Sequence, residues 1–326
     1  MKPLLEVKGL SKSYFLQRGW WGRGLQELKA VDHVSFSIQP GEQLGLVGES
    51  GCGKSSVGEL LVRLIEPDSG TILYDGKDLT SLSQRALKPF RKQIQIVFQD
   101  PFASLNPRLT IGETLEEPII IHKLADSATE RQDMVKSLLE MVGLPRSTPS
   151  QYPHEFSGGQ RQRISLARAL ATEPKFIVAD EAVSSLDVSI QAQVLSLIRS
   201  LQSELGLSML FISHDLGAVR YICDRIAVMY LGNIVEIAPS DELFKHPKHP
   251  YTRTLMTAIP SLRASKRSDP ALVMGEMPSP LNPPSGCHFR NRCPVALPAC
   301  ASQVPVLDEV APGHSSACIR HDLADN

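Results

Sequence analysis

A glycine-rich segment near the N-terminus has the residue types and spacing that bind nucleotide phosphates. Residues 48–56 read GESGCGKSS and match the pattern G-x-x-x-x-G-K-[ST]. In such a loop backbone N–H groups surround the phosphates, a lysine neutralises the β and γ phosphates, and a hydroxyl group ligates Mg²⁺. A chance glycine-rich turn is the alternative, and the strand and helix expected on either side of the loop argue against it. The residues expected to contact the nucleotide are Gly48, Glu49, Ser50, Gly51, Cys52, Gly53, Lys54, Ser55 and Ser56, with Ser55 also on Mg²⁺.

Two acids follow a short apolar run that ends at Ala179. Ligands in open α/β sheets bind at the carboxyl ends of the strands. Asp180 is therefore predicted to contact Mg²⁺ directly or through its hydration shell, and Glu181 to polarise a water for attack on the γ phosphate. A strand that leaves the core through two solvated acids is the alternative, which the phosphate loop in the same chain disfavours. His214 follows the next apolar strand and is expected at the same edge, in contact with the γ phosphate.

Apolar periodicity predicts the elements that position these residues. Strands are expected in the segments 4–10, 31–38, 43–47, 93–98, 175–180 and 207–213, and helices in 57–65, 189–205 and much of 110–172. Strands that alternate with helices predict a mainly parallel sheet and an α/β core. The helical stretch predicts an inserted helical subdomain at about 100–172. Beyond residue 240 prolines crowd together, which predicts a small loop-rich C-terminal extension over 241–326.

Composition restricts the classes of function. The chain has 326 residues, of which 42% are hydrophobic, so it can bury a substantial core. Its net charge of −1 argues against the wide basic field that nucleic-acid binding usually needs. No stretch approaches the roughly 18 consecutive apolar residues of a spanning helix, and MKPLLEVKGL lacks the apolar core of a secretion signal. We therefore expect a cytosolic protein, even if it works at a membrane.

At residues 156–163, FSGGQRQR, the chain resembles the ATP-binding cassette (ABC) family, and the resemblance covers residues 4 to about 240. Ser157, Gly158, Gly159 and Gln160 open a predicted helix, so they offer backbone donors and a helix dipole to an anion. In the family this signature reaches across a head-to-tail dimer to the nucleotide on the partner's phosphate loop. The resemblance implies an ATPase whose nucleotide-binding domain spans residues 1–240. This domain would have a P-loop NTPase (RecA-like) core and an antiparallel β subdomain.

The resemblance also assigns roles to single residues. Tyr14 matches the aromatic that stacks on adenine, with the neighbouring Phe15 or simple core packing as alternatives. Gln99 matches the glutamine that touches Mg²⁺ and the attacking water, and His214 matches the switch histidine. Ser184, Ser185, Leu186 and Asp187 match the loop that crosses the dimer interface. One departure is Ala182, where the family usually has a proline that would stiffen the turn after Glu181.

Two further segments narrow the resemblance. QDPFASLNP after Gln99 and HPKHPYTRTLMTAIP at 246–260 resemble the ATPase subunits of dipeptide and oligopeptide importers, a group that includes nickel and glutathione systems. The group implies a heterodimer with a paralogous ATPase subunit, two permease subunits and an external substrate-binding protein, with this chain at the cytoplasmic face of the inner membrane. The rival classes are a soluble ABC ATPase of translation or DNA repair, which typically has two cassettes or a coiled coil, and a P-loop kinase or GTPase, which needs no signature helix.

Four of the six cysteines crowd into the extension. Cys287, Cys293, Cys300 and Cys318 have the spacing C-x5-C-x6-C-x17-C, whereas Cys52 and Cys223 stand alone. Zinc sites usually show tighter cysteine pairs, so the spacing favours a [4Fe-4S] cluster, as does the importer resemblance. Zinc remains an alternative, with help from His288, His314 or His321, and so do free thiols. We expect any cluster to be structural, because a short proline-rich segment has little core of its own.

Overall fold

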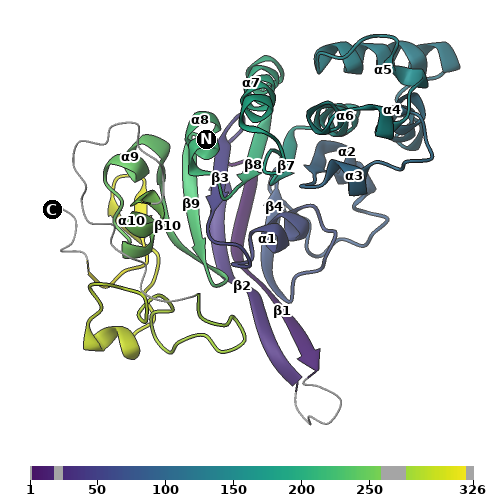
Figure 1. Cartoon of the computed structure of the whole chain (residues 1–326). Helices are drawn as coiled ribbons and strands as arrows, with labels where there is room; N and C mark the ends of the chain where they lie inside the picture. Colours follow the sequence, from purple (N-terminus) through teal and green to yellow (C-terminus); the bar gives the residue numbers. More distant parts are fainter. Residues whose placement is uncertain (1, 18–24, 258–276, 321–326) are drawn as a thin grey trace. The chain divides into compact units, whose positions relative to one another are not determined.

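The computed structural model describes residues 2–17, 25–257 and 277–320 (Figure 1). The chain divides into two compact units. The helical unit contains residues 38–43 and 81–213, and the P-loop unit contains residues 2–37, 44–80 and the chain from 214 onward. Among the residues so described, no helix is long and apolar enough to cross a membrane.

The P-loop unit contains strands from both ends of the chain. Four strands form one sheet in the order β2-β1-β4-β5, with bounds Leu25–Ile38 for β2, Leu5–Gln17 for β1, Ser69–Tyr74 for β4 and Lys77–Asp78 for β5. In this sheet β1 pairs antiparallel with β4, and β4 pairs antiparallel with β5. A second group begins with β3 (Gln43–Val47), which is parallel to β9 (Arg225–Tyr230). From β9 the pairing continues antiparallel through β10 (Asn233–Pro239), β12 (His314–Ser316) and β11 (Asp308–Ala311). The C-terminal extension therefore adds two strands to the sheet that carries β3.

Helix α1 (Lys54–Leu61) follows β3 through the glycine-rich loop, as the sequence predicts, but it ends earlier than the apolar pattern over 57–65 suggested. Its end is a Schellman motif, in which the N–H of Leu64 donates to the carbonyl of Glu59 and Arg63 has a positive φ of 55°. A residue in this left-handed conformation cannot continue a helix. The remaining helices of the unit are α8 (Leu216–Ile222), α9 (Ser240–Lys245), α10 (Pro250–Thr257) and the short η3 (Pro298–Ala301).

The helical unit has three strands at its centre. β6 (Ile94–Val97) and β8 (Ser208–Ile212) both pair parallel with β7 (Phe176–Asp180), and all five residues of β7 are buried. Continuous burial explains the unbroken apolar run of this strand. The predicted helical stretch forms α3 (Pro101–Ser104), α4 (Ile111–Ile121), α5 (Ala128–Met141), η1 (Thr148–Ser150), η2 (Pro153–Glu155) and α6 (Gly158–Leu170), of which α4, α5 and α6 lie together in Figure 1. Two more helices, α2 (Lys88–Gln93) and α7 (Val188–Leu205), complete the unit.

An aromatic cluster joins Phe289 of the C-terminal extension to β9 and to α10 within the P-loop unit. The ring of Phe289 lies 5.4 Å from the ring of Tyr230, edge to face, and 5.4 Å from the ring of Tyr251. All three side chains are at most 1% exposed. Such aromatic pairs stabilise beyond the area they bury. The extension is thus held by a buried core as well as by the pairing of β12 with β10.

Candidate functional site

The glycine-rich loop has the geometry of an anion-binding turn. α1 begins directly at Lys54, and its N-cap is Gly53 with a φ of 106°. A Cβ atom on Gly53 would lie 2.0 Å from the carbonyl oxygen of Ala30, so no larger residue fits there. The buried Lys54 ammonium donates to the carbonyl oxygens of Gly48 at 2.8 Å and Glu49 at 3.0 Å. Lys54 therefore lies at the N-terminal end of α1, a position where phosphate groups bind.

The two acids at the end of β7 lie in the helical unit together with Gln99. Asp180 ends β7 and is 7% exposed, and Glu181 follows with a positive φ of 46°. The Gln99 Nε2 atom donates to the Glu181 Oε2 atom at 2.9 Å. The N–H of Glu181 donates to the carbonyl of Ile212, and its own carbonyl accepts from the backbone and hydroxyl of Ser184. A non-glycine residue in this region of φ costs on the order of 1–3 kcal/mol, and such strain is concentrated at functional sites.

The signature segment forms the N-terminus of α6. Ser157 is the N-cap, its hydroxyl accepts the N–H of Gln160, and the Gln160 side chain accepts the N–H of Ser157, which completes a capping box. A Cβ atom on Gly159 would lie 2.3 Å from Ile190 of α7. The glycine therefore allows α6 and α7 to approach closely. Ser157 and Gln160 are exposed, so a ligand can reach this helix end.

The other sequence-predicted residues are distributed over both units. Ser185 and Asp187 are exposed in the loop that leads into α7, within the helical unit. His214 is exposed and belongs to the P-loop unit, as does Tyr14, which is half-buried on β1. The Lys12 ammonium lies 5.8 Å from the Tyr14 ring, and Phe15 is 64% exposed. Both aromatics therefore stay candidates for adenine.

Sequence reasoning missed one polar contact of the phosphate loop. The guanidinium of Arg292, in the extension, donates two hydrogen bonds of 3.0 Å to the two carboxylate oxygens of Glu49. The N–H of Glu49 donates to the hydroxyl of Tyr251 at 2.9 Å. The residues Glu49 and Arg292 are 243 positions apart, and no local pattern connects positions so distant.

The four cysteines of the extension line one cavity, and no disulfide joins them. Burial raises the pKa of Cys287 to about 11, an effect that a backbone hydrogen bond from Phe289 opposes and that the other three thiols reinforce. Burial likewise raises the pKa of Cys293, opposed by a hydrogen bond from Val295. The N–H groups of Leu297 and Arg320 donate to the Sγ atoms of Cys300 and Cys318, each at 3.4 Å. Each thiol thus receives a backbone hydrogen bond.

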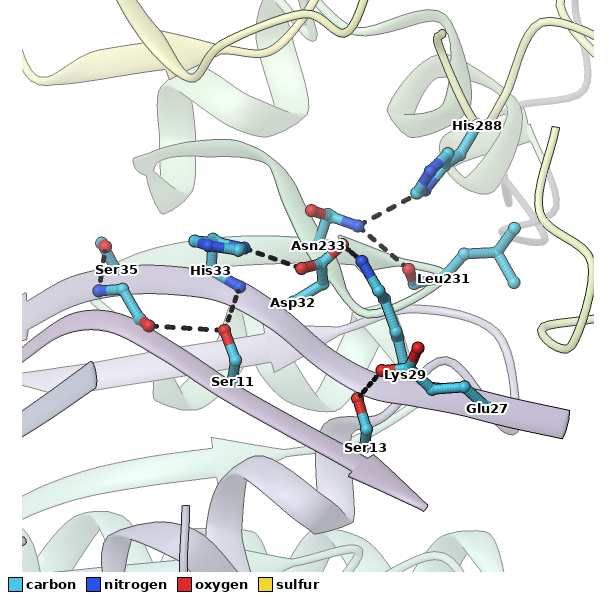
Figure 2. Close-up of polar contacts among 11 residues, drawn as sticks. Ser11, Ser13, Glu27, Lys29, Asp32, His33, Ser35, Leu231, Asn233 and His288 are labelled. Atoms are coloured by element: carbon cyan, nitrogen blue, oxygen red, sulfur yellow. Dashed lines mark hydrogen bonds and ion pairs between the residues drawn. The ribbon is translucent and has the colours of Figure 1, made fainter. Parts of the chain in front are cut away.

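Two of the histidines that could help to bind zinc have other partners. The Nδ1 atom of His288 lies 3.4 Å from the Asn233 amide nitrogen, as Figure 2 shows. The Nε2 atom of His314 lies 2.7 Å from the buried carboxylate of Glu236. His321 lies outside the described residues. Within the described ranges no group of three or more His, Cys, Asp or Glu side chains is arranged to hold a metal ion.

Comparisons with known proteins agree with these features. Residues 31–184 match the model of the ABC transporter family, and residues 235–300 match the model described as the oligopeptide/dipeptide transporter C-terminal region. A protein of Brucella ovis that is named as a peptide import ATP-binding protein is 55% identical over 98% of this chain and 99% of its own. The oligopeptide transport ATP-binding protein AppF of Bacillus subtilis is 51% identical over 97% of each chain.

The structure is also similar to solved ATP-binding cassettes. The cassette MJ0796, in a dimeric post-hydrolysis state with ADP and Pi, superposes with a TM-score of 0.64 at 28% identity, over 72% of this chain and 98% of that one. The second family model matches the C-terminal region separately, over residues 235–300.

Proposed function

This chain belongs to the ABC transporter family, as an ATP-hydrolysing subunit with an oligopeptide/dipeptide transporter C-terminal region, and we propose that it powers the import of dipeptides or oligopeptides. One observation carries the choice of peptides as cargo. Nearly the whole chain, extension included, aligns at 50–55% identity with proteins named for peptide import or oligopeptide transport. A generic cassette would share the ATPase core alone.

Each residue of the site has a role in the proposed hydrolysis of ATP. Lys54 and the loop N–H groups would bind the β and γ phosphates, and Ser55, Gln99 and Asp180 would hold Mg²⁺, which neutralises the charge that develops on the phosphates. Glu181 would take a proton from the attacking water, and the 2.9 Å hydrogen bond from Gln99 orients its carboxylate. His214 would contact the γ phosphate, and Tyr14 or Phe15 would stack on the adenine.

The signature helix supports a site shared between two chains. Ser157, Gly158, Gly159 and Gln160 would contact ATP on the phosphate loop of a second ATPase subunit, and the loop with Ser185 and Asp187 would line that interface. As a subunit of an ABC importer the chain works with membrane permeases. We infer that its dimer partner is a paralogous ATPase, that an external binding protein delivers the peptide, and that this chain sits at the cytoplasmic face of the inner membrane.

Reconstitution tests this function. The chain, its paralogue and the permeases are placed in proteoliposomes with the binding protein, and uptake of a labelled dipeptide is measured with ATP inside or outside. We expect uptake that stops with Lys54→Ala, because the phosphates lose their cation. Uptake of nickel or glutathione in place of peptides would contradict the assigned cargo. Association with ribosomes or DNA and no permease would contradict transport altogether.

We also propose that the four cysteines hold a [4Fe-4S] cluster. The support is that the thiols surround one cavity and that each receives a backbone N–H, which stabilises an anionic sulfur. Sulfurs around one zinc would lie about 3.8 Å apart, given Zn–S bonds of about 2.3 Å. A four-iron cluster would hold its ligands farther apart than one zinc ion does. A cluster here would supply covalent cross-links that fix the extension.

The test is elemental analysis of protein purified without oxygen. About four iron atoms per chain and a broad visible absorbance, both lost on Cys293→Ser, would support the cluster. Stoichiometric zinc, or metal-free protein after anaerobic purification and reconstitution with iron and sulfide, would refute it.

A further inference from the structure

The link between the extension and the phosphate loop has a consequence for the nucleotide site. Glu49 is one of the loop residues between Gly48 and Lys54, and its side chain is 28% exposed. A carboxylate in this loop repels the phosphates of ATP, since both are anions at neutral pH and partial burial weakens the screening by water. Unless the charge is balanced, Glu49 opposes the function of its own loop.

Arg292 supplies the balancing charge. Its side chain is 7% exposed, and its two N–H groups meet the two carboxylate oxygens of Glu49 at 3.0 Å each. This bidentate arrangement is the strongest form of Arg–carboxylate pairing. The guanidinium also lies 5.8 Å from the centre of the Tyr230 ring and 5.9 Å from that of Phe289. The aromatic cluster thus fixes the guanidinium in one place.

The backbone of Glu49 is fixed as well. Its N–H donates to the Tyr251 hydroxyl, and its carbonyl accepts from Lys54 at 3.0 Å. Tyr251 is fully buried and contacts the same Phe289 ring that lies beside Arg292. Two residues of the extension, Arg292 and Tyr251, therefore balance the charge of Glu49 and hold its backbone.

We infer that Arg292 is a positioning residue of the ATP site, which neutralises Glu49 and so allows the phosphate loop to bind a polyanion at full affinity. The inference rests on the proposed function, because it assumes that this loop binds ATP. It adds that part of the nucleotide affinity is supplied by the C-terminal extension, through a residue between two of its cysteines, Cys287 and Cys293.

Equilibrium binding to the full chain tests the inference, by calorimetric titration of ATP and of ADP with EDTA present so that no hydrolysis occurs. The variant Arg292→Met keeps the apolar stem against the rings and removes the charge. We expect its Kd for ATP to rise about tenfold, because the unbalanced carboxylate of Glu49 then repels the phosphates. The Kd for ADP should rise less, about threefold, because ADP carries less negative charge. Arg290→Met is the matched control, because Arg290 lies close to Arg292 in the sequence but donates to the carbonyl of Ala301. This variant should bind ATP as the unaltered chain does.

Two further variants separate the effect of the Arg292 charge from that of its bidentate geometry. In the double variant E49Q/R292M no carboxylate needs to be balanced, so the affinity for ATP should return to within about threefold of the unaltered chain. Arg292→Lys keeps the charge without the bidentate geometry and should fall between the single variant and the unaltered chain. Arg292→Lys carries the test if Arg292→Met proves too unstable to purify.

Three results would overturn the inference: ATP affinity unchanged in Arg292→Met, equal losses for ATP and ADP, or no recovery in E49Q/R292M. The proposed function would be contradicted instead if the unaltered chain failed to bind ATP, or bound it no better than Lys54→Ala.

Discussion

His249 makes the P-loop unit sensitive to acid. The side chain is 1% exposed, and burial lowers the pKa of this histidine to about 4, an effect that the charge of Glu236 opposes. The Nδ1 atom accepts the N–H of Tyr251 at 3.1 Å, so this nitrogen must carry no proton. The ring lies 5.8 Å from that of Phe289. Protonation would thus place a charge in the cluster that holds the extension and remove one hydrogen bond.

The sign and size follow from linkage. The pKa of His249 is lower in the folded chain than in the unfolded one, where it is about 6.5. As the pH falls through 6.5 the unfolded chain takes up a proton first, so folding stability is lost between about pH 6.5 and pH 4. Between pH 8 and pH 5 the loss from this one group is about 2 kcal/mol.

Urea unfolding followed by circular dichroism at pH 8 and pH 5 would measure this loss. Carboxylates contribute as well, so the informative quantity is the difference between the unaltered chain and His249→Asn, in which the amide oxygen can still accept the N–H of Tyr251. We expect the variant to lose about 2 kcal/mol less between the two pH values. His246→Asn, at the exposed C-cap residue of α9, is the control and should behave as the unaltered chain. Equal losses in His249→Asn and the unaltered chain would refute the reasoning.

Two predictions concern the helical unit. Glu181→Gln keeps a partner for Gln99 and removes the proton acceptor, so phosphate release by the assembled importer should fall about 10²- to 10⁴-fold while ATP still binds; turnover at the normal rate would show that the base is elsewhere. Gly159→Ala places a methyl group 2.3 Å from Ile190, and overpacking of this kind costs about 1–3 kcal/mol, measured as a lower urea midpoint. Shortening Ile190 to Ala in the same chain should restore part of that stability, and a midpoint equal to the parent for Gly159→Ala alone would contradict the close approach of α6 and α7.

Local patterns predicted most of the elements. The strand before the phosphate loop, the buried strand before Asp180 and the capped start of α6 lie where short-range sequence signals placed them, because each depends on periodicity or on residues a few positions apart. The predicted end of α1 is wrong, because the apolar pattern over 57–65 continues while the backbone turns at Arg63. Sequence alone could not reveal the left-handed conformation of Glu181 or the contact between Glu49 and Arg292. Both depend on packing between segments that are distant in the chain.

The pairing of β12 with β10 limits how a smaller version of this protein could be made. Cutting the chain after residue 257 would remove the strand beside β10 and expose the rings of Tyr230 and Tyr251 to water. It would also leave Glu49 with no cation opposite its two oxygens. A minimal cassette cut at that point would therefore need a neutral residue at position 49 and polar replacements on the bared sheet before its ATP binding could be compared with that of the intact chain.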